Sequence, residues 1–453
     1  MAHPIAAIAT AFGRSGIGVL RMSGTDAIAL AGRVFSLSSG APLLDLPDRK
    51  LARGTLFDAS GRPIDEALVF VSRAPHSYTG EDTVEFQCHG SPAVLSSGLS
   101  ALLAAGFHQA GPGEFTKRAF LNGQMDLTQA EAVIDLIDAE TADAAANAAG
   151  QVAGVLRRKL DPIYDSLMDI CSHFHAVLDY PDEDIEPFQL QSYDAVLWKA
   201  ENSLEALLSS CRRGNFIKNG IQTAILGAPN AGKSSLLNLM AGFERVIVTD
   251  IPGTTRDAVE QTVTLGRHFL RLLDTAGIRE TDDTVERLGV ARSLKAAQSC
   301  QLAIFVVDGA KPLTPEDEAA MDAALQAPEA IAILNKQDLP CQVDASDLPF
   351  SYVIPVSCTK GEGLDLLEQA LDMIFEEDAP CDGSILTNAR QADAICKARE
   401  ALSAARASLR QAMTPDAVLV DVEAAMQALG EATGRVVRED ITNRIFARFC
   451  VGK

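Results

Sequence analysis

The chain has 453 residues, of which 47% are hydrophobic, so it is long enough for about two to four domains with sizeable cores. Its formal net charge is −22. This acidic balance disfavours a protein that grips nucleic acid unaided, because such proteins usually present a basic stripe.

Cysteine usage and the first residues indicate a cytoplasmic protein. The nine cysteines are scattered and contain no CxxC pair, which disfavours a disulfide framework or a zinc site and fits a reducing compartment. The amino-terminal segment has no basic residue before Arg14 and does not resemble a signal peptide. No apolar run reaches the roughly 18 residues that a membrane span needs. We therefore expect a cytoplasmic location.

Residues 1–118 predict a mixed α/β domain. Several apolar runs have the length and boundaries of strands, and two further stretches have helical spacing. The expected strands are 5–10, 16–22, 66–72 and 83–89, and the expected helices are 25–35 and 92–105. Gly111, Pro112 and Gly113 then break the chain and end this region.

Two helical segments flank a central region. Residues 119–213 keep apolar side chains at helical spacing, interrupted by a proline and an acidic cluster at 180–185. Residues 377–453 are expected to be helical to the end, with one apolar face formed by Val418, Val422, Ala425, Met426 and Leu429. The economical topology is a single helical domain with another domain inserted between its halves.

The central region, residues 214–376, alternates short apolar runs with helical stretches. This alternation is typical of a mostly parallel, doubly wound sheet. The expected strands are 223–227, 269–274, 302–308, 330–335 and 352–357.

The inserted domain carries a phosphate-binding loop. Residues 227–234 are Gly-Ala-Pro-Asn-Ala-Gly-Lys-Ser, which matches G-x-x-x-x-G-K-[ST] between an expected strand and an expected helix at 235–241. The glycines allow backbone N–H groups to approach phosphates. Lys233 is expected to contact the β- and γ-phosphates, and the Ser234 hydroxyl is expected to ligate Mg²⁺.

Further motifs indicate a Ras-like domain that reads guanine. Residues 274–277 (Asp-Thr-Ala-Gly) fit the segment that senses Mg²⁺ and the γ-phosphate, and Thr255 is the expected second Mg²⁺ ligand. Residues 335–338 (Asn-Lys-Gln-Asp) end in a carboxylate that can accept hydrogen bonds from guanine N1 and N2. Residues 357–359 (Ser-Cys-Thr) would complete the base pocket through backbone amides. Motifs in this order at strand ends predict a GTPase.

The residues expected to bind GTP come from all these segments. They are Asn230, Ala231, Gly232, Lys233, Ser234, Ser235, Thr249, Asp250, Ile251, Pro252, Gly253, Thr254, Thr255, Asp274, Thr275, Ala276, Gly277, Asn335, Lys336, Asp338, Ser357, Cys358 and Thr359.

The catalytic apparatus is less conventional. Ile278 occupies the position where small GTPases often have a water-orienting glutamine. Charged residues downstream are candidates for that role, although a solvated charged loop is the simpler interpretation; they are Arg279, Glu280, Asp282, Asp283 and Glu286. Asn230 offers a side-chain carbonyl inside the phosphate loop. It either caps the turn or holds a monovalent cation in place of an arginine finger, whose contribution to the rate is about 10³–10⁵.

Segments outside the GTPase motifs carry a resemblance over nearly the full length. They resemble the MnmE family, also called TrmE, of tRNA uridine-5-carboxymethylaminomethyl modification GTPases. The segments are Ala9-Thr10, 13–18 with Arg21, 78–82, 88–90, 113–116, 118–122, 180–183 and 449–453.

The resemblance implies cofactors and partners. It implies an N-terminal domain that resembles folate-binding one-carbon enzymes, forms a homodimer and binds 5-formyl- or 5,10-methylene-tetrahydrofolate. It implies a K⁺-dependent GTPase whose two G domains pair across the nucleotides. The family works in a heterotetramer with a partner that uses FAD, MnmG or GidA, on C5 of the wobble uridine in certain tRNAs. From the net charge of −22 we expect this partner to hold most of the tRNA.

Matching the family's motifs residue by residue implies roles for individual positions. The implied ligands are Asn230, Thr249, Ile251 and Thr254 for K⁺, Ser234 and Thr255 for Mg²⁺, and Arg21, Glu85, Gln124 and Lys453 for folate, while Glu286 and Lys233 are the catalytic residues.

Three positions need separate comment. Gln124 stands where the family commonly has lysine, and Pro252 stands where alanine is usual, which removes one amide donor. The family places Cys450 beside the folate, whereas a partly buried thiol is the simpler interpretation, because a reactive thiol needs electropositive neighbours.

The expected organisation has four segments. They are a tetrahydrofolate-binding and dimerisation domain at 1–118, the first helical part at 119–213, the G domain at 214–376 and the second helical part at 377–453. Two alternative functions remain. One is a ribosome-assembly GTPase switch, although such proteins usually append a basic RNA-binding module. The other is a folate-binding scaffold whose GTPase only regulates assembly.

Overall fold

The computed structural model describes residues 3–179, 190–243, 261–273, 297–375, 381–436, 445–447 and 449–452. The chain forms two compact units, which are described separately. The first comprises Met1–Ile134, Gln151–Ala200 and Lys397–Lys453, and the second comprises Asp135–Gly150 and Glu201–Cys396. Among the described residues, no helix is both long enough and apolar enough to cross a lipid bilayer.

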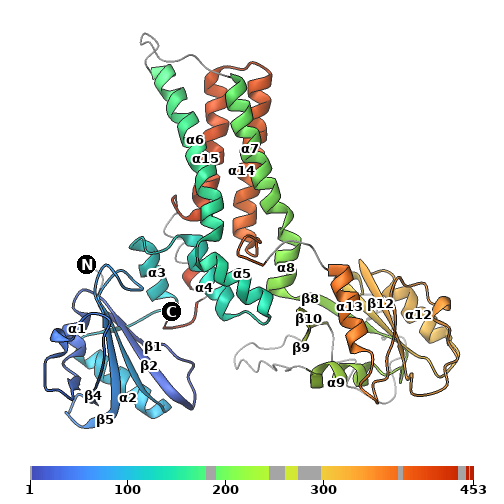
Figure 1. Cartoon of the computed structure of the whole chain (residues 1–453), viewed down its shortest axis with the longest axis horizontal. Coiled ribbons are helices and arrows are strands. Elements are labelled where there is room, and N and C mark those ends of the chain that lie inside the picture. The colour runs from blue at the N-terminus through green and yellow to red at the C-terminus, as the bar shows by residue number, and fades with distance from the viewer. Residues whose placement is uncertain are drawn as a thin grey trace. The chain divides into compact units, whose positions relative to one another are not determined.

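The first unit contains a seven-stranded sheet in the order β3-β4-β5-β6-β2-β1-β7. All neighbours are antiparallel except β1 and β7. Helices α1 and α2 pack against this sheet (Figure 1). The elements are β1 (Ile5–Ile8), β2 (Ser15–Ser23), α1 (Ala27–Ala31), β3 (Phe35–Leu37), β4 (Leu51–Phe57), β5 (Pro63–Ser72), β6 (Thr83–Gly90), α2 (Pro92–Ala105) and β7 (His108–Gln109).

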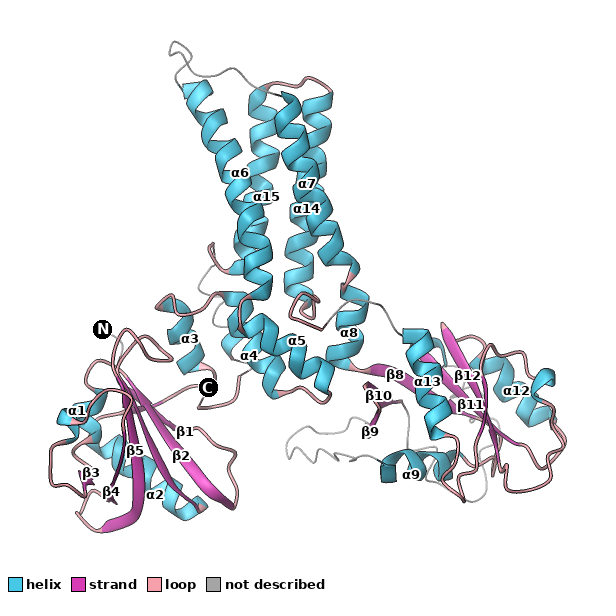
Figure 2. Cartoon of the chain, viewed as in Figure 1, coloured by secondary structure: helices cyan, strands magenta, loops and turns pink. Residues whose placement is uncertain are grey.

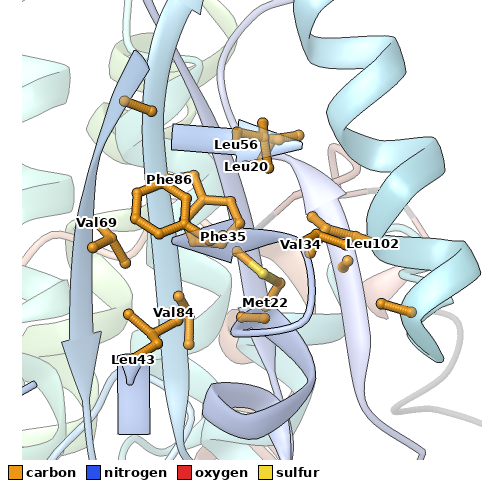
Figure 3. Close-up of a cluster of buried hydrophobic side chains, with 14 of the residues drawn as sticks. Leu20, Met22, Val34, Phe35, Leu43, Leu56, Val69, Val84, Phe86 and Leu102 are labelled. Carbon is orange, nitrogen blue, oxygen red and sulfur yellow. The ribbon is translucent and has the colours of Figure 1, made fainter. Parts of the chain in front are cut away.

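The core of this domain lies between the sheet and its helices (Figure 3). Leu20, Leu56, Val69 and Phe86 have no exposed surface. The rings of Phe35 and Phe86 stack with centroids 4.6 Å apart. Burial of each such side chain contributes about 1.5–3 kcal/mol.

The four strands predicted in this region are confirmed, whereas the helix predicted at 25–35 is wrong over much of its length. Helix α1 covers only Ala27–Ala31, and Phe35 begins strand β3. The apolar residues after Gly32 suggested further helical turns, but Phe35 is buried as a strand residue against Phe86. Strands β3, β4 and β7 were not predicted.

The other named elements of the first unit are helices. Helices α6 and α15 lie side by side (Figure 2), and Cys171 Sγ is 3.4 Å from Met426 Sδ across their contact. The apolar face predicted for residues 418–429 is confirmed, because all five of its side chains are buried. The elements are α3 (Glu114–Leu121), α4 (Leu127–Ile137), α6 (Val155–Asp179), α7 (Leu190–Ser209), α14 (Ala389–Arg410) and α15 (Pro415–Thr433), of which α4, α7 and α14 continue into the second unit.

The expectation of helix to the end of the chain is wrong for residues 449–452. The Gly113 amide donates to the Cys450 carbonyl at 3.2 Å, and Val451 forms a β-bridge with Pro112. Gly452 has φ +99°, and a Cβ there would lie 2.5 Å from the Ile8 carbonyl oxygen. The terminal segment is thus extended along the N-terminal domain, in a conformation that requires glycine.

The second unit contains a six-stranded sheet in the order β13-β12-β11-β8-β10-β9. Only β9 is antiparallel to its neighbour. Two apolar clusters cover its two faces, which confirms the doubly wound sheet predicted from the sequence. The elements are β8 (Ile221–Leu226), α9 (Lys233–Phe243), β9 (Gln261–Leu265), β10 (His268–Leu272), β11 (Leu302–Asp308), α12 (Pro315–Ala324), β12 (Glu329–Asn335), β13 (Val353–Pro355) and α13 (Leu364–Phe375).

Two more helices belong to this unit, α5 (Ala142–Val152, up to Gly150) and α8 (Cys211–Asn219). Residues 383–386, which follow the sheet in the sequence, form hydrogen bonds with these helices. The Asn147 side chain bonds the backbone of Gly383 and Ile385, and the Leu386 amide donates to Ser210 Oγ at 3.0 Å. Gly214 allows the close approach of this segment, since a Cβ there would lie 1.9 Å from the Leu386 carbonyl oxygen.

We expect Gly54→Ala to destabilise the N-terminal domain by about 1–3 kcal/mol, the usual cost of overpacking. A Cβ at Gly54 would lie 2.3 Å from both Phe35 Cε1 and the Ser36 carbonyl oxygen. Urea unfolding of the full chain, followed by hydrogen exchange in strands β4–β6, measures the loss. Gly13→Ala is the matched control, because nothing lies within 4 Å of a Cβ there. Equal stability of the two variants would contradict this account.

Candidate functional site

The phosphate loop connects β8 to α9 at the carboxyl edge of the six-stranded sheet. Two of its glycines have left-handed backbones, φ +151° at Gly227 and +107° at Gly232. A Cβ at Gly227 would lie 2.2 Å from the Val306 carbonyl oxygen, and one at Gly232 would lie 2.0 Å from Asn335 Nδ2. Neighbouring strands therefore press directly against the loop, and only glycine fits at these positions.

Lys233 places a positive charge inside this loop. Its Nζ donates to the carbonyl oxygens of Gly227 at 2.7 Å and Ala228 at 2.8 Å. Burial lowers the pKa of Lys233, and the Asp317 carboxylate opposes that shift. Ser234 and Ser235 follow in the first turn of α9, where backbone N–H groups favour an anion. Asn230 adopts φ +61° in the turn itself.

The segment at 335–338, which is expected to contact the base, is hydrogen-bonded to the phosphate loop through Asn335. Its Nδ2 donates to the Ala231 carbonyl at 2.9 Å, and its Oδ1 accepts from the Cys358 amide at 3.4 Å. The Ser357 hydroxyl donates to Asp338 Oδ1 at 2.8 Å. Three predicted segments, at 227–235, 335–338 and 357–359, therefore meet at one edge of the sheet. Thr359 is the exposed member of the third segment.

Asp308 is a further residue of this site that the sequence interpretation missed. Its Oδ2 is 2.7 Å from Lys336 Nζ, and its Oδ1 accepts from the Ala310 amide at 3.1 Å. Although burial raises it, the Lys336 and Ala310 hydrogen bonds hold the pKa of Asp308 below its usual range. Lys336 has φ +63°, so its backbone is also constrained. A polar residue that ends an apolar strand beside the other motifs was the available signal.

Several predicted site residues lie outside the described residues. They are Thr249, Asp250, Ile251, Pro252, Gly253, Thr254, Thr255, Asp274, Thr275, Ala276, Gly277, Glu286 and Lys453. Their roles stay predictions.

The predicted folate residues Arg21 and Glu85 lie opposite each other on β2 and β6. Their neighbours Leu20, Met22, Val84 and Phe86 are buried in the core, so both charged side chains point to the other face of the sheet. Arg21 Nε is 2.7 Å from Glu85 Oε1, and Arg21 Nη1 donates to the Gly452 carbonyl at 3.2 Å. The two side chains therefore form an ion pair with each other.

Residues from other predicted segments surround this pair. The Arg21 guanidinium lies 5.8 Å from the Tyr78 ring centroid and 5.9 Å from that of Phe115. The Tyr78 hydroxyl is 2.8 Å from Thr116 Oγ1. Gln124 lies beside the same loop, since a Cβ at Gly80 would be 3.0 Å from its Nε2. The structure thus brings together Arg21, Glu85 and the segments at 78–80 and 113–124.

Comparison with known proteins covers both units. Residues 4–124 match the family model described as the GTP-binding protein TrmE N-terminus, and residues 127–450 match that of the MnmE helical domain. The tRNA modification GTPase MnmE of Symbiobacterium thermophilum is 42% identical over 99% of each chain. The proteins of that name from a Roseiflexus species and from Alkaliphilus metalliredigens are 41% and 40% identical, each over 99% of both chains.

Among solved structures, the G domain of the T. maritima FeoB iron transporter is similar to part of this chain. The identity is 22%, the match covers 34% of this chain and 99% of that one, and the TM-score is 0.27.

We expect Asp308→Ala to weaken guanine nucleotide binding about tenfold, or about 1.4 kcal/mol. The substitution removes the charged hydrogen bond that fixes Lys336, and such bonds contribute about 1.5–3 kcal/mol. Titration with a fluorescent GDP analogue measures the affinity. Asp322→Ala, at an exposed position on α12, serves as control. An unchanged dissociation constant for Asp308→Ala would show that Lys336 is positioned without its partner.

Proposed function

The chain belongs to the MnmE family of tRNA modification GTPases, and from this premise we propose that it hydrolyses GTP in the service of tRNA modification. In this proposal it acts as a homodimer in the cytoplasm, in a heterotetramer with an FAD-dependent partner of the MnmG (GidA) type. The product carries a carboxymethylaminomethyl group at C5 of the wobble uridine in certain tRNAs. The single observation that carries the proposal is the identity of about 40% over nearly the whole length of relatives with that name.

The nucleotide site supports the first half of this proposal. Lys233 neutralises charge on the β- and γ-phosphates, and Asp338 and Asn335 select guanine. Ser234 and Thr255 hold Mg²⁺, which supplies charge neutralisation at the transferred phosphoryl group. In the proposed mechanism Glu286 orients the attacking water, because Ile278 has no polar group for that purpose.

Asn230 supports the proposed K⁺ dependence. Its φ of +61° lies in the left-handed region that asparagine tolerates better than most residues, so this turn of the phosphate loop carries a side-chain amide rather than a glycine. The side-chain oxygen of Asn230 and the backbone carbonyl oxygens of Thr249, Ile251 and Thr254 would suit a hard monovalent cation. The ion supplies positive charge next to the phosphates, as an arginine finger does elsewhere.

The face of the N-terminal sheet opposite to its core supports a tetrahydrofolate donor. Arg21 and Glu85 offer a cation and an acceptor beside the aromatic ring of Tyr78. This combination fits a ligand with a hydrogen-bonding ring and a carboxylate tail. Gln124 replaces the family's usual lysine, and its amide remains able to bond a neutral part of the ligand. When bound, the folate supplies the one-carbon unit.

The whole-chain matches also bear on the ribosome-assembly alternative. The relatives are similar over the N-terminal and helical domains as well as the GTPase domain. We therefore favour modification over an assembly switch.

Deletion of the gene tests the main proposal. We expect mass spectrometry of bulk tRNA to show loss of the C5 substituent at wobble uridines, restored by a plasmid with the wild-type gene. Glu286→Ala should bind GTP and fail to restore it. Unchanged wobble uridines in the deletion strain would refute the proposal. Restoration by Glu286→Ala would favour a scaffold whose GTPase only regulates assembly.

Substitution of Asn230 tests the cation. Asn230→Gly removes the side-chain amide without straining the left-handed backbone. We expect wild-type hydrolysis to be faster in K⁺ than in Na⁺ by up to about 10³-fold, the lower range for an arginine finger, and the variant to lose most of this difference. Asn202→Ala, on the exposed surface of α7, is the control. Equal wild-type rates in the two salts would remove Asn230 from the mechanism.

A further inference from the structure

The carboxyl and amino ends of the parallel strands in the six-stranded sheet meet different parts of the chain. Strands β8 and β10 are parallel, with Ile221 opposite Leu270 and Thr223 opposite Leu272. The carboxyl end of β8 leads to the phosphate loop, and the carboxyl end of β10 lies at the same edge. Their amino ends, at Ile221 and His268, lie at the opposite edge, where helix α8 enters the sheet. The two strands therefore connect the edge that carries the phosphate loop with the end that meets α8.

The turn between β9 and β10 is fixed to helix α13 at that edge. Arg267 Nε and His268 Nε2 lie 2.9 Å and 2.8 Å from Asp372 Oδ1. Gly266 has φ +57°, and a Cβ there would lie 1.9 Å from Glu368 Oε1 on the same helix. Although burial raises it, the hydrogen bonds from His268 and Arg267 hold the pKa of Asp372 below its usual range, as expected for a carboxylate with two donors.

Helix α13 in turn contacts helix α8. The Phe216 and Phe375 rings pack edge to face with centroids 5.2 Å apart, and the His268 ring is 6.3 Å from Phe375. Phe375 is the last residue of α13 and Phe216 lies in the last turns of α8. A chain of side-chain contacts therefore connects the β9–β10 turn to α8 through Asp372 and Phe375.

A single glycine separates α8 from β8. Gly220 has φ +75°, and a Cβ there would lie 2.6 Å from the Phe269 ring and 2.8 Å from the Phe269 carbonyl oxygen. Helix and strand thus meet at a sharp, closely packed bend that only glycine permits. No flexible linker lies between α8 and β8 that could absorb a displacement of β8 or β10.

The space at this junction is small. A cavity of about 40 Å³ is bordered by Arg213, Phe216, Ile221, His268, Phe269 and Phe375. It has room for an ordered water and is far below the roughly 300 Å³ of a small-molecule pocket. The cluster is therefore better suited to transmit a displacement than to bind a ligand.

We propose that Arg267, His268, Asp372, Phe375 and Phe216 form an output joint, through which the nucleotide state of the GTPase domain reaches helix α8. The proposal rests on GTP binding by the phosphate loop. It places the coupling element at the edge of the sheet remote from the nucleotide and assigns it to residues that contact neither GTP nor metal.

Hydrogen exchange of the full-length protein tests the joint. We expect amides of Cys211–Asn219 in the wild type to exchange at rates that differ at least about threefold between GDP and a non-hydrolysable GTP analogue. Asp372→Ala should bind both nucleotides normally and hydrolyse GTP at the wild-type rate, but lose this difference. Phe216→Leu, which keeps the apolar volume and removes the ring edge, should do the same. Asp322→Ala on α12 should behave as wild type.

Three results would overturn the joint. They are wild-type α8 exchange that ignores the nucleotide, an undiminished response in both joint variants, or an equal loss in Asp322→Ala. Nucleotide affinity is measured separately on the same samples. A wild-type protein that bound no guanine nucleotide would instead refute the proposed function, so the two failures are distinguishable.

Discussion

Parallel hydrogen bonding among β8, β11 and β12 brings the carboxyl ends of three strands to one edge of the six-stranded sheet. The phosphate loop begins at that edge, and strands β11 and β12 end there at Asp308 and Asn335. Because strand ends are fixed by the register, a side chain such as Asn335 can bond the loop that follows a different strand. The same register fixes the opposite edge, where α8 meets β8 and β10. The sheet therefore connects two sites at opposite ends of its strands, the nucleotide site at one end and helix α8 at the other.

The meeting of the segments at 227–235, 335–338 and 357–359 was predictable from sequence, because these segments are encoded in short, ordered motifs. A glycine pattern and an Asn-Lys-x-Asp pattern each specify local backbone and chemistry together. Asp308 was not predicted because its position depends on an ion pair with Lys336, which directly follows strand β12, and no local sequence pattern records that pairing. The joint at α8 escaped for the same reason, since Asp372 and Arg267 meet only through the folded chain.

Errors in the N-terminal domain have a different origin. Residues 25–35 have an apolar spacing compatible with a helix, yet tertiary packing draws Phe35 into a strand against Phe86. Strand β4 was missed because it mixes polar and apolar residues around Gly54, a weak pattern by itself. The sequence also did not reveal the cross-strand pairing of Arg21 with Glu85, which any ligand of both groups must share or displace.

The contact of residues 450–452 with Pro112, Gly113 and Arg21 has a consequence for biosynthesis. The ribosome synthesises the N-terminal domain before the helical and GTPase segments, whereas residues 450–452 follow all of these segments. Until then Arg21 lacks its carbonyl partner and the edge beside Pro112 stays open. The contacts of this domain are therefore completed only after the helical and GTPase segments have been synthesised, so a chain truncated before residue 450 would lack them however well the core of the domain had folded.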